Sequence, residues 1–207
     1  MTTVKMAMSA DFLTAFAKLP SQQQRGVRAM ISRFERDSRS SGLNYERIAN
    51  AKDPNMRSLR IDGGYRAIVL KPAKGNVHML LWADKHDDAY NWATRHVCSI
   101  NAETGALQVY QPQHVAESEA DEQSAQPSAE ERASSAIHNE AHDIFAELKH
   151  RELVRLGVPA DMVAEVLDIR TEDDLEALAP RLPSEAYDAL FLYMAGETYE
   201  QIIRNRE

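Results

Sequence analysis

The spacing of hydrophobic residues predicts that the chain begins with two amphipathic helices. Over 9–20 and 21–38, large apolar side chains recur every three or four residues, which places them on one helical face. Ser9 and Ser21 stand where N-cap residues are preferred. The apolar positions on these faces are Phe12, Phe16, Val27, Met30, Ile31 and Phe34.

After the helices, the pattern changes to alternating apolar and polar residues and predicts β-strands. The strands are expected at about 56–62, 65–71 and 76–83. Between them, "DGG" and "KPAKGN" supply the glycine and proline residues that hairpin turns use. A short helix, "DAYNWATRHV", and a last strand, "GALQVYQ", follow. We therefore expect an α+β domain over residues 1–112, with two N-terminal helices against an antiparallel sheet.

The rest of the chain separates into a polar segment and a small all-α domain. Residues 113–136 are rich in Ser, Ala, Gln and Glu. Such a composition cannot offset the entropy of ordering, so we expect an acidic flexible linker here. In residues 137–207, helical spacing with breaks at "LGVPAD", "IRTEDD" and "RLPSEAY" predicts four or five short helices.

Charge divides the chain at the same place. Residues 1–112 carry 16 Lys and Arg against 10 Asp and Glu, whereas residues 113–207 carry 8 against 22. A basic first half suits a phosphate-bearing partner, and the acidic second half would repel such a partner or lie against the first half in its place. Two solvated surfaces of opposite sign would give the same counts.

The composition also limits where the protein works. No apolar run approaches the length of a membrane span, and the N-terminus lacks the apolar region of a signal peptide. The single cysteine, Cys98, cannot form an internal disulfide and fits a reducing compartment. We therefore expect a cytoplasmic protein without membrane contact.

The order of elements resembles a known family. Two N-terminal helices precede "AKDPNMRSLRIDGGYRAIVLK", and a strand then runs into "KHDDAYNWA". This order, and above all "SLRIDGGYRAIV", resembles the RelE/ParE toxin superfamily over about residues 8–112. For RelE-type toxins, the resemblance implies cleavage of messenger RNA in the ribosome without a metal or other cofactor, by attack of a ribose 2′-OH on the adjacent phosphate. Such chemistry needs a base, cations around the phosphate and an acid for the leaving oxygen.

The resemblance assigns roles to particular residues. Arg66 would stabilise the phosphate, His86 stands at the end of the last core strand, and Tyr90 would stack on a base or handle a proton. These three are the catalytic candidates if the chain is a ribonuclease. The side chains expected to contact nucleic acid are Arg57, Arg60, Arg66, Lys71 and Lys85. Acidic residues on both sides of His86 repel phosphate, which favours binding over cleavage.

Each of these roles has a structural alternative. Arg66 could project from an exposed face and pair with Asp62 or Asp84. Tyr90 could be a packing aromatic, and His86 could cap a helix or lie on the surface. Proteins of this superfamily that act on gyrase instead of RNA leave no simple motif, so that activity stays open as well.

A second resemblance concerns residues 144–202, which contain "LGVPADMV", "IRTEDDLEAL" and "LPSEAYDALF". After a RelE-like domain, this segment resembles the N-terminal region of bacterial UvrD/Rep-like superfamily 1 DNA helicases. It implies an accessory region that contacts DNA, RNA or a protein partner, and that touches a downstream helicase core. The chain has no G-x-x-x-x-G-K-[ST] loop, so we expect no ATPase activity from these residues and a chain that continues into a helicase.

Two other hypotheses belong to different classes. In the first, the chain is a RelE-type toxin that acts on the ribosome, and its acidic helical module serves in cis as the antitoxin. In the second, the fold is a protein-interaction module without nucleic-acid contact.

One histidine pair has a spacing that can bind a metal. His138 and His142 in "HNEAH" share a helical face with His150. A zincin site requires Glu directly after the first histidine, and Asn139 stands there instead. We therefore expect no metal site and a solvated helix face.

Overall fold

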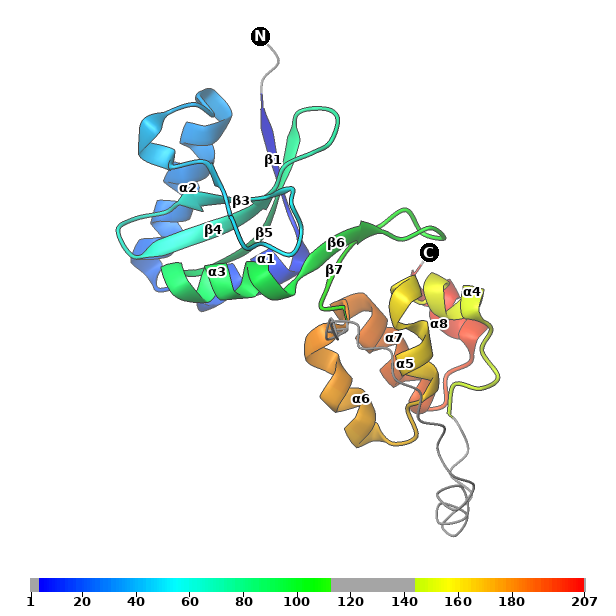
Figure 1. Ribbon diagram of the computed structural model, residues 1–207. Helices are drawn as coiled ribbons and strands as arrows, with labels where there is room; N and C mark the ends of the chain where they lie inside the picture. The colour runs from blue at the N-terminus through cyan, green and yellow to red at the C-terminus, as the bar shows by residue number, and fades with distance from the viewer. Residues whose placement is uncertain (1–3, 113–143, 207) are drawn as a thin grey trace, which may run out of the picture.

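The computed structural model describes residues 4–112 and 144–206, which form an α+β unit and a helical unit (Figure 1). The expected linker and the pair His138 and His142 lie outside the described residues. The α+β class and the helical C-terminal region agree with the sequence prediction.

A mixed five-stranded sheet forms the centre of the first unit. Its strands are β1 (Lys5–Met8), β2 (Glu46–Arg47), β3 (Met56–Arg60), β4 (Tyr65–Leu70) and β5 (Val77–Lys85), in the order β1-β5-β4-β3-β2. The meander of β3, β4 and β5 is antiparallel, as predicted. The expectation of a purely antiparallel sheet is corrected at one edge, where β1 pairs in parallel with β5. Both β1 and β2 are too short to give a clear alternation in the sequence.

Helices cover both faces of this sheet. They are α1 (Ala10–Lys18), α2 (Ser21–Arg36) and α3 (His86–Arg95), with a short 3-10 turn η1 (Ser41–Leu43) after α2. One core lies between the sheet and α1 with α2, and a second lies between the sheet and α3. Ser9 caps α1 as predicted, since its hydroxyl accepts from the backbone N–H of Phe12 at 3.1 Å. Ser21 is the first residue of α2 instead, and Pro20 occupies the N-cap position.

A two-stranded hairpin, β6 (Val97–Ile100) with β7 (Leu107–Tyr110), lies between the two units (Figure 1). The sequence predicted a helix through residue 97 and placed the last strand with the meander. The helix ends at Arg95, and β7 pairs with β6 in a separate sheet. Gly105 provides the positive φ of 70° that the tight connection needs.

The hairpin contributes to the cores of both units, because neighbouring residues of a strand point to opposite faces. The side chains that face the α3 core are Cys98, Leu107 and Val109, and those that face the helical unit are Val97 and Tyr110. Between Leu107 and Val109, the buried Gln108 amide donates to the carbonyl of Gly157 in the helical unit. The two units are therefore joined by packing and by hydrogen bonds.

The helical unit contains five short α-helices, within the predicted range of four or five. They are α4 (His150–Arg155), α5 (Val163–Leu167), α6 (Glu172–Leu178), α7 (Ser184–Met194) and α8 (Tyr199–Arg206), with 3-10 turns η2 (Ala160–Met162) and η3 (Ala179–Arg181). Phe191 is 41% exposed and stacks beside Tyr187. In the described ranges, no helix is long and apolar enough to span a membrane.

We expect Gln108→Leu to lower the free energy of unfolding by about 1–3 kcal/mol, because it leaves the buried Gly157 carbonyl without its donor. Urea unfolding followed by circular dichroism measures this loss. Gln22→Leu on the exposed face of α2 is the control and should change stability by less than about 0.5 kcal/mol. Equal effects of the two substitutions would contradict the role given to Gln108.

His78 on β5 gives stability a dependence on pH. Its ring lies 5.1 Å from that of Phe34 and 5.8 Å from that of Tyr45, measured between centroids. Its Nδ1 is buried and has no hydrogen-bond partner among the described residues. Burial lowers the pKa of His78 below 6.5, and Lys71 adds to this, although a backbone hydrogen bond at Asn76 opposes it.

Stability should therefore fall as the pH drops below about 6.5, because the unfolded chain binds a proton that the folded His78 does not accept. His96, whose pKa burial also lowers, contributes in the same direction. Urea unfolding at about pH 7.5 and about pH 5.5 tests this in the wild type and in His78→Gln, which should lose part of the difference. The exposed His150→Gln should keep all of the difference, and a wild-type stability that does not change with pH would refute the account.

Candidate functional site

The turn between β3 and β4 is organised by Asp62. One carboxylate oxygen accepts from the backbone N–H groups of Gly64 at 2.8 Å and Tyr65 at 3.0 Å, and the other accepts from the Gln23 amide at 3.0 Å. Partial burial alone would raise the pKa of Asp62, but these three hydrogen bonds and the nearby Arg66 hold it below its usual range. The carboxylate therefore stays charged and keeps the turn in one shape.

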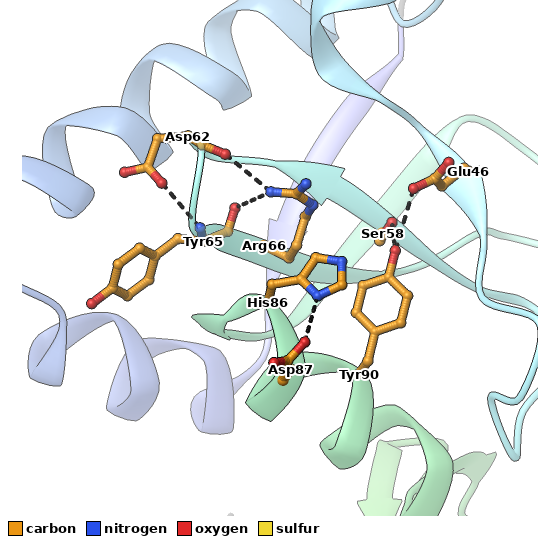
Figure 2. Close-up of polar contacts among 8 residues, drawn as sticks. All are labelled: Glu46, Ser58, Asp62, Tyr65, Arg66, His86, Asp87 and Tyr90. Atoms are coloured by element: carbon orange, nitrogen blue, oxygen red, sulfur yellow. Dashed lines mark hydrogen bonds and ion pairs between the residues drawn. The ribbon is translucent and has the colours of Figure 1, made fainter.

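The backbone of the same turn holds the guanidinium of Arg66. Its Nη1 donates to the carbonyl oxygens of Asp62 and Tyr65, at 3.0 Å each (Figure 2). Arg60 donates from Nε to the same Asp62 carbonyl at 3.2 Å. The Nε of Arg66 is buried without a partner among the described residues. Arg66 thus contacts Asp62 through the backbone carbonyl and not through the carboxylate. The alternative of an exposed Arg66 paired with an acidic side chain stays untested.

His86 and Tyr90 lie next to this turn, at the start of α3. The backbone N–H of His86 donates to the carbonyl of Gly64 at 2.8 Å, which ties the helix to the turn. One helical turn apart, the His86 and Tyr90 rings stack with centroids 4.5 Å apart and planes 20° apart. His86 Nδ1 lies 2.8 Å from a carboxylate oxygen of Asp87 (Figure 2). This contact orients the imidazole and leaves Nε2 for other partners.

The hydroxyl of Tyr90 joins α3 to the far edge of the sheet. It lies 3.0 Å from the hydroxyl of Ser58 on β3 and donates to the carboxylate of Glu46 on β2 at 3.3 Å (Figure 2). Ser58 is completely buried, so this contact satisfies a group that water cannot reach. Tyr90 is consequently fixed at both its ring and its hydroxyl.

The structure brings the three catalytic candidates together. Arg66 pairs with Arg60 on β3 and with Asp84 on β5, and its side chain lies on the sheet face that α3 covers. His86 and Tyr90 belong to that same helix. Arg66, His86 and Tyr90 therefore share one face of the sheet, as Figure 2 shows.

The five expected nucleic-acid contacts do not form one surface. Arg57 pairs with Val69, a residue of the core under α1 and α2, so the side chain of Arg57 is directed to the face opposite Arg66. Lys85 pairs with Tyr65 and is directed to that opposite face as well. Lys71 follows the end of β4, where its backbone N–H bonds to Asn55. Arg60 and Arg66 share the face that α3 covers, whereas Arg57 and Lys85 are directed to the other face. Nucleic-acid contact by any of the five stays a prediction.

Two residues of the site were not singled out from the sequence. Ser58 lies at an inward position of "MRSLR", between Met56 and Arg60 on the same face, and a small polar residue there was the available signal. Glu46 lies on a two-residue strand, which is too short to give a periodic pattern.

Other groups that could carry chemistry were also located. In residues 4–112 and 144–206, no cluster of three or more His, Cys, Asp or Glu side chains could hold a metal ion. His150 is exposed at the first position of α4. Burial, followed by the negative charges of Asp53 and Asp11, raises the pKa of the Cys98 thiol to about 12.

Removing the Tyr90 hydroxyl should destabilise the fold. Tyr90→Phe leaves the buried Ser58 hydroxyl without its partner, so we expect a loss of about 1–3 kcal/mol in the free energy of unfolding. Urea unfolding measures the loss, with Tyr65→Phe as a matched control, because the Tyr65 hydroxyl bonds to no described residue. A Tyr90→Phe protein as stable as the wild type would show that the Ser58 contact contributes nothing.

Comparison with known proteins gives a distant similarity in structure. No family model matches the sequence. The search of the curated proteins finds no match either. Among solved structures, this chain is similar to a chain of the toxin–antitoxin complex RelBE2 from Mycobacterium tuberculosis. The two share 16% sequence identity, and the TM-score is 0.33. The match covers 41% of this chain and all of the RelBE2 chain. The chain thus shows a distant structural similarity to a RelE-type complex over part of its length, and no activity follows from it.

Proposed function

We propose that this chain is a metal-independent endoribonuclease of the RelE type, acting through Arg66, His86 and Tyr90. The observation that carries the proposal is that these three side chains meet beside the β3–β4 turn, on one face of the sheet. The broader nucleic-acid-binding surface has less support, because its five cations are divided between faces.

Each of the three side chains suits one requirement of the reaction. The guanidinium of Arg66 has N–H groups on Nη2 besides those of Nη1, which bonds to the turn, and these would stabilise the charge that develops on the phosphate. The imidazole of His86, oriented by Asp87, would transfer a proton through Nε2. The ring of Tyr90 stacks on the imidazole of His86, and the contact of its hydroxyl with Ser58 holds the ring in place.

The carboxylates of Asp87 and Glu46 are compatible with the roles proposed for His86 and Tyr90. Asp87 keeps one imidazole nitrogen engaged, in the way that a carboxylate orients the histidine of other proton-transfer sites. Glu46 accepts from Tyr90 at the edge of the sheet. Among the described residues, neither of these carboxylates bonds to Arg66, whose Nη1 donates to backbone carbonyls.

The helical unit is placed away from this site. Its hydrogen bonds to the first unit are made with the β6–β7 hairpin and its flanks. They run from Asn101 to Val154, Gln108 to Gly157, Tyr110 to Asp161, Gln111 to Pro180 and Arg181, and Arg151 to Glu103. In the described residues, none of these bonds reaches Arg66, His86 or Tyr90. We therefore propose that the full chain is active, and that residues 1–112 alone would expose the half of the hairpin that faces the helical unit.

The resemblance of residues 144–202 to the N-terminal region of helicases stays a hypothesis. It rests on three sequence phrases, and no contact in the structure bears on it.

The test is cleavage of messenger RNA on translating ribosomes by the purified full chain, which is first treated with EDTA and dialysed. Cleavage with 2′,3′-cyclic phosphate ends is expected, because the 2′-OH attacks the adjacent phosphate. Arg66→Ala should slow cleavage by about 100-fold or more, and His86→Gln by a similar factor. Primer extension locates the cuts, and quantifying the products gives the rates.

Arg204→Ala on α8 serves as the control, since it removes an exposed arginine far along the chain from the site. It should cleave at the wild-type rate. A wild-type chain that leaves ribosome-bound and free RNA intact would refute the proposed function, as would equal activity of Arg66→Ala and the wild type.

A further inference from the structure

A groove at the junction of the two units has aromatic walls. Its volume is about 540 Å³, and it is formed by α1, β5, α3, β7 and the start of α7. The lining residues that matter here are Asp11, Trp82, Trp92, His96, Gln111 and Tyr187. None of them belongs to the Arg66 site, so this groove is independent of the proposed ribonuclease.

Three of these rings form a continuous stack. Trp82 and Trp92 have centroids 5.4 Å apart and planes 7° apart, and Trp92 and His96 have centroids 4.1 Å apart and planes 13° apart. His96 is held at both nitrogens, by the Trp92 carbonyl at 2.7 Å and by the Gln111 amide nitrogen at 3.1 Å. Burial lowers the pKa of His96. The stack is thus rigid, flat and uncharged at neutral pH.

A carboxylate without a counter-ion lies in the same groove. In the described part of the chain, the Asp11 carboxylate forms neither an ion pair nor a hydrogen bond. Burial raises its pKa, and the negative charge of Glu185 on the helical unit raises it further. Lys18 also lines the groove, but it is exposed and lies seven residues along α1, roughly 10 Å away. Among the described residues, no cationic side chain therefore pairs with Asp11.

We propose that this groove binds a planar organic cation, namely a guanidinium group, carried by an arginine side chain of a partner or by a small guanidine. A guanidinium stacks on indole faces and pairs with a carboxylate through two parallel N–H groups, so it meets both features of the groove. An ammonium ion would pair with Asp11 but gain less from flat rings. A neutral nucleobase would stack and leave the carboxylate without a counter-ion.

The position of the groove gives binding a second effect. Asp11 comes from the first unit and Tyr187 from the helical unit, so a bound cation contacts both. Because a cation also relieves the repulsion between Asp11 and Glu185, its binding strengthens the contact between the units.

Tryptophan fluorescence of the full chain tests the proposal directly, because both tryptophans of the protein are in the stack. The probes are agmatine, which is a small guanidine, and the peptide Ala-Arg-Ala, with sodium chloride added to equal ionic strength. Saturable quenching at millimolar concentration is expected from the guanidinium. Tighter binding of Ala-Arg-Ala than of agmatine assigns the site to a polypeptide, and the reverse order assigns it to a small guanidine.

Two variants distinguish binding in the groove from a general effect of the negative charge of the protein. Asp11→Asn keeps the size of the side chain and should weaken binding by about tenfold or more, with an unchanged circular dichroism spectrum. Asp173→Asn, on the exposed side of α6, should bind as the wild type does. No saturable quenching, equal affinity for Ala-Lys-Ala, tighter binding of guanosine, or an unaffected Asp11→Asn would each overturn the proposal.

Discussion

The alternation of side chains along β7 determines how the two units of this protein meet. Leu107 and Val109 pack into the core beneath α3, while Tyr110 packs into the helical unit and Gln108 bonds to it. If the register of β7 shifted by one residue, its two faces would be exchanged. The Gln108 amide would then lie in the core beneath α3, and Val109 would face the backbone carbonyl of Gly157. The contact is therefore specified residue by residue, and the aromatic groove beside it exists because this register holds.

Helix α3 connects the two chemically distinct regions of the molecule. Its first residue, His86, is tied to the β3–β4 turn, and the histidine that follows its last turn, His96, is tied to Gln111 at the end of β7. His86 and Tyr90 lie in the first half of α3, and Trp92 lies near its end, where it stacks on Trp82 of β5. Hydrogen bonds therefore fix α3 at both ends.

The sequence predicted the parts of this fold that depend on strong local patterns. Helices α1 and α2 and strands β3 to β5 have clear periodicity, and Arg66, His86 and Tyr90 were identified through the resemblance of their surroundings. Strand β6 was not predicted because the helical spacing of Trp92 and His96 continues to the residue before the strand begins. Hydrogen-bond partners such as the Asp62 carbonyl or Glu46 could not be predicted, since they depend on the shape of a turn and on pairing between distant strands.

The reactivity of the Cys98 thiol depends on how the hairpin packs. Cys98 is the only cysteine in the chain, it packs toward the α3 core, and burial raises the pKa of its thiol to about 12, so little thiolate is present at neutral pH. Thiolates are the species that alkylating reagents attack, so alkylation of the folded protein should be slow. Separation of the hairpin from the core would remove this burial and return the thiol to an ordinary pKa. Faster alkylation of Cys98 would therefore report exposure of the hairpin by which the two units are joined.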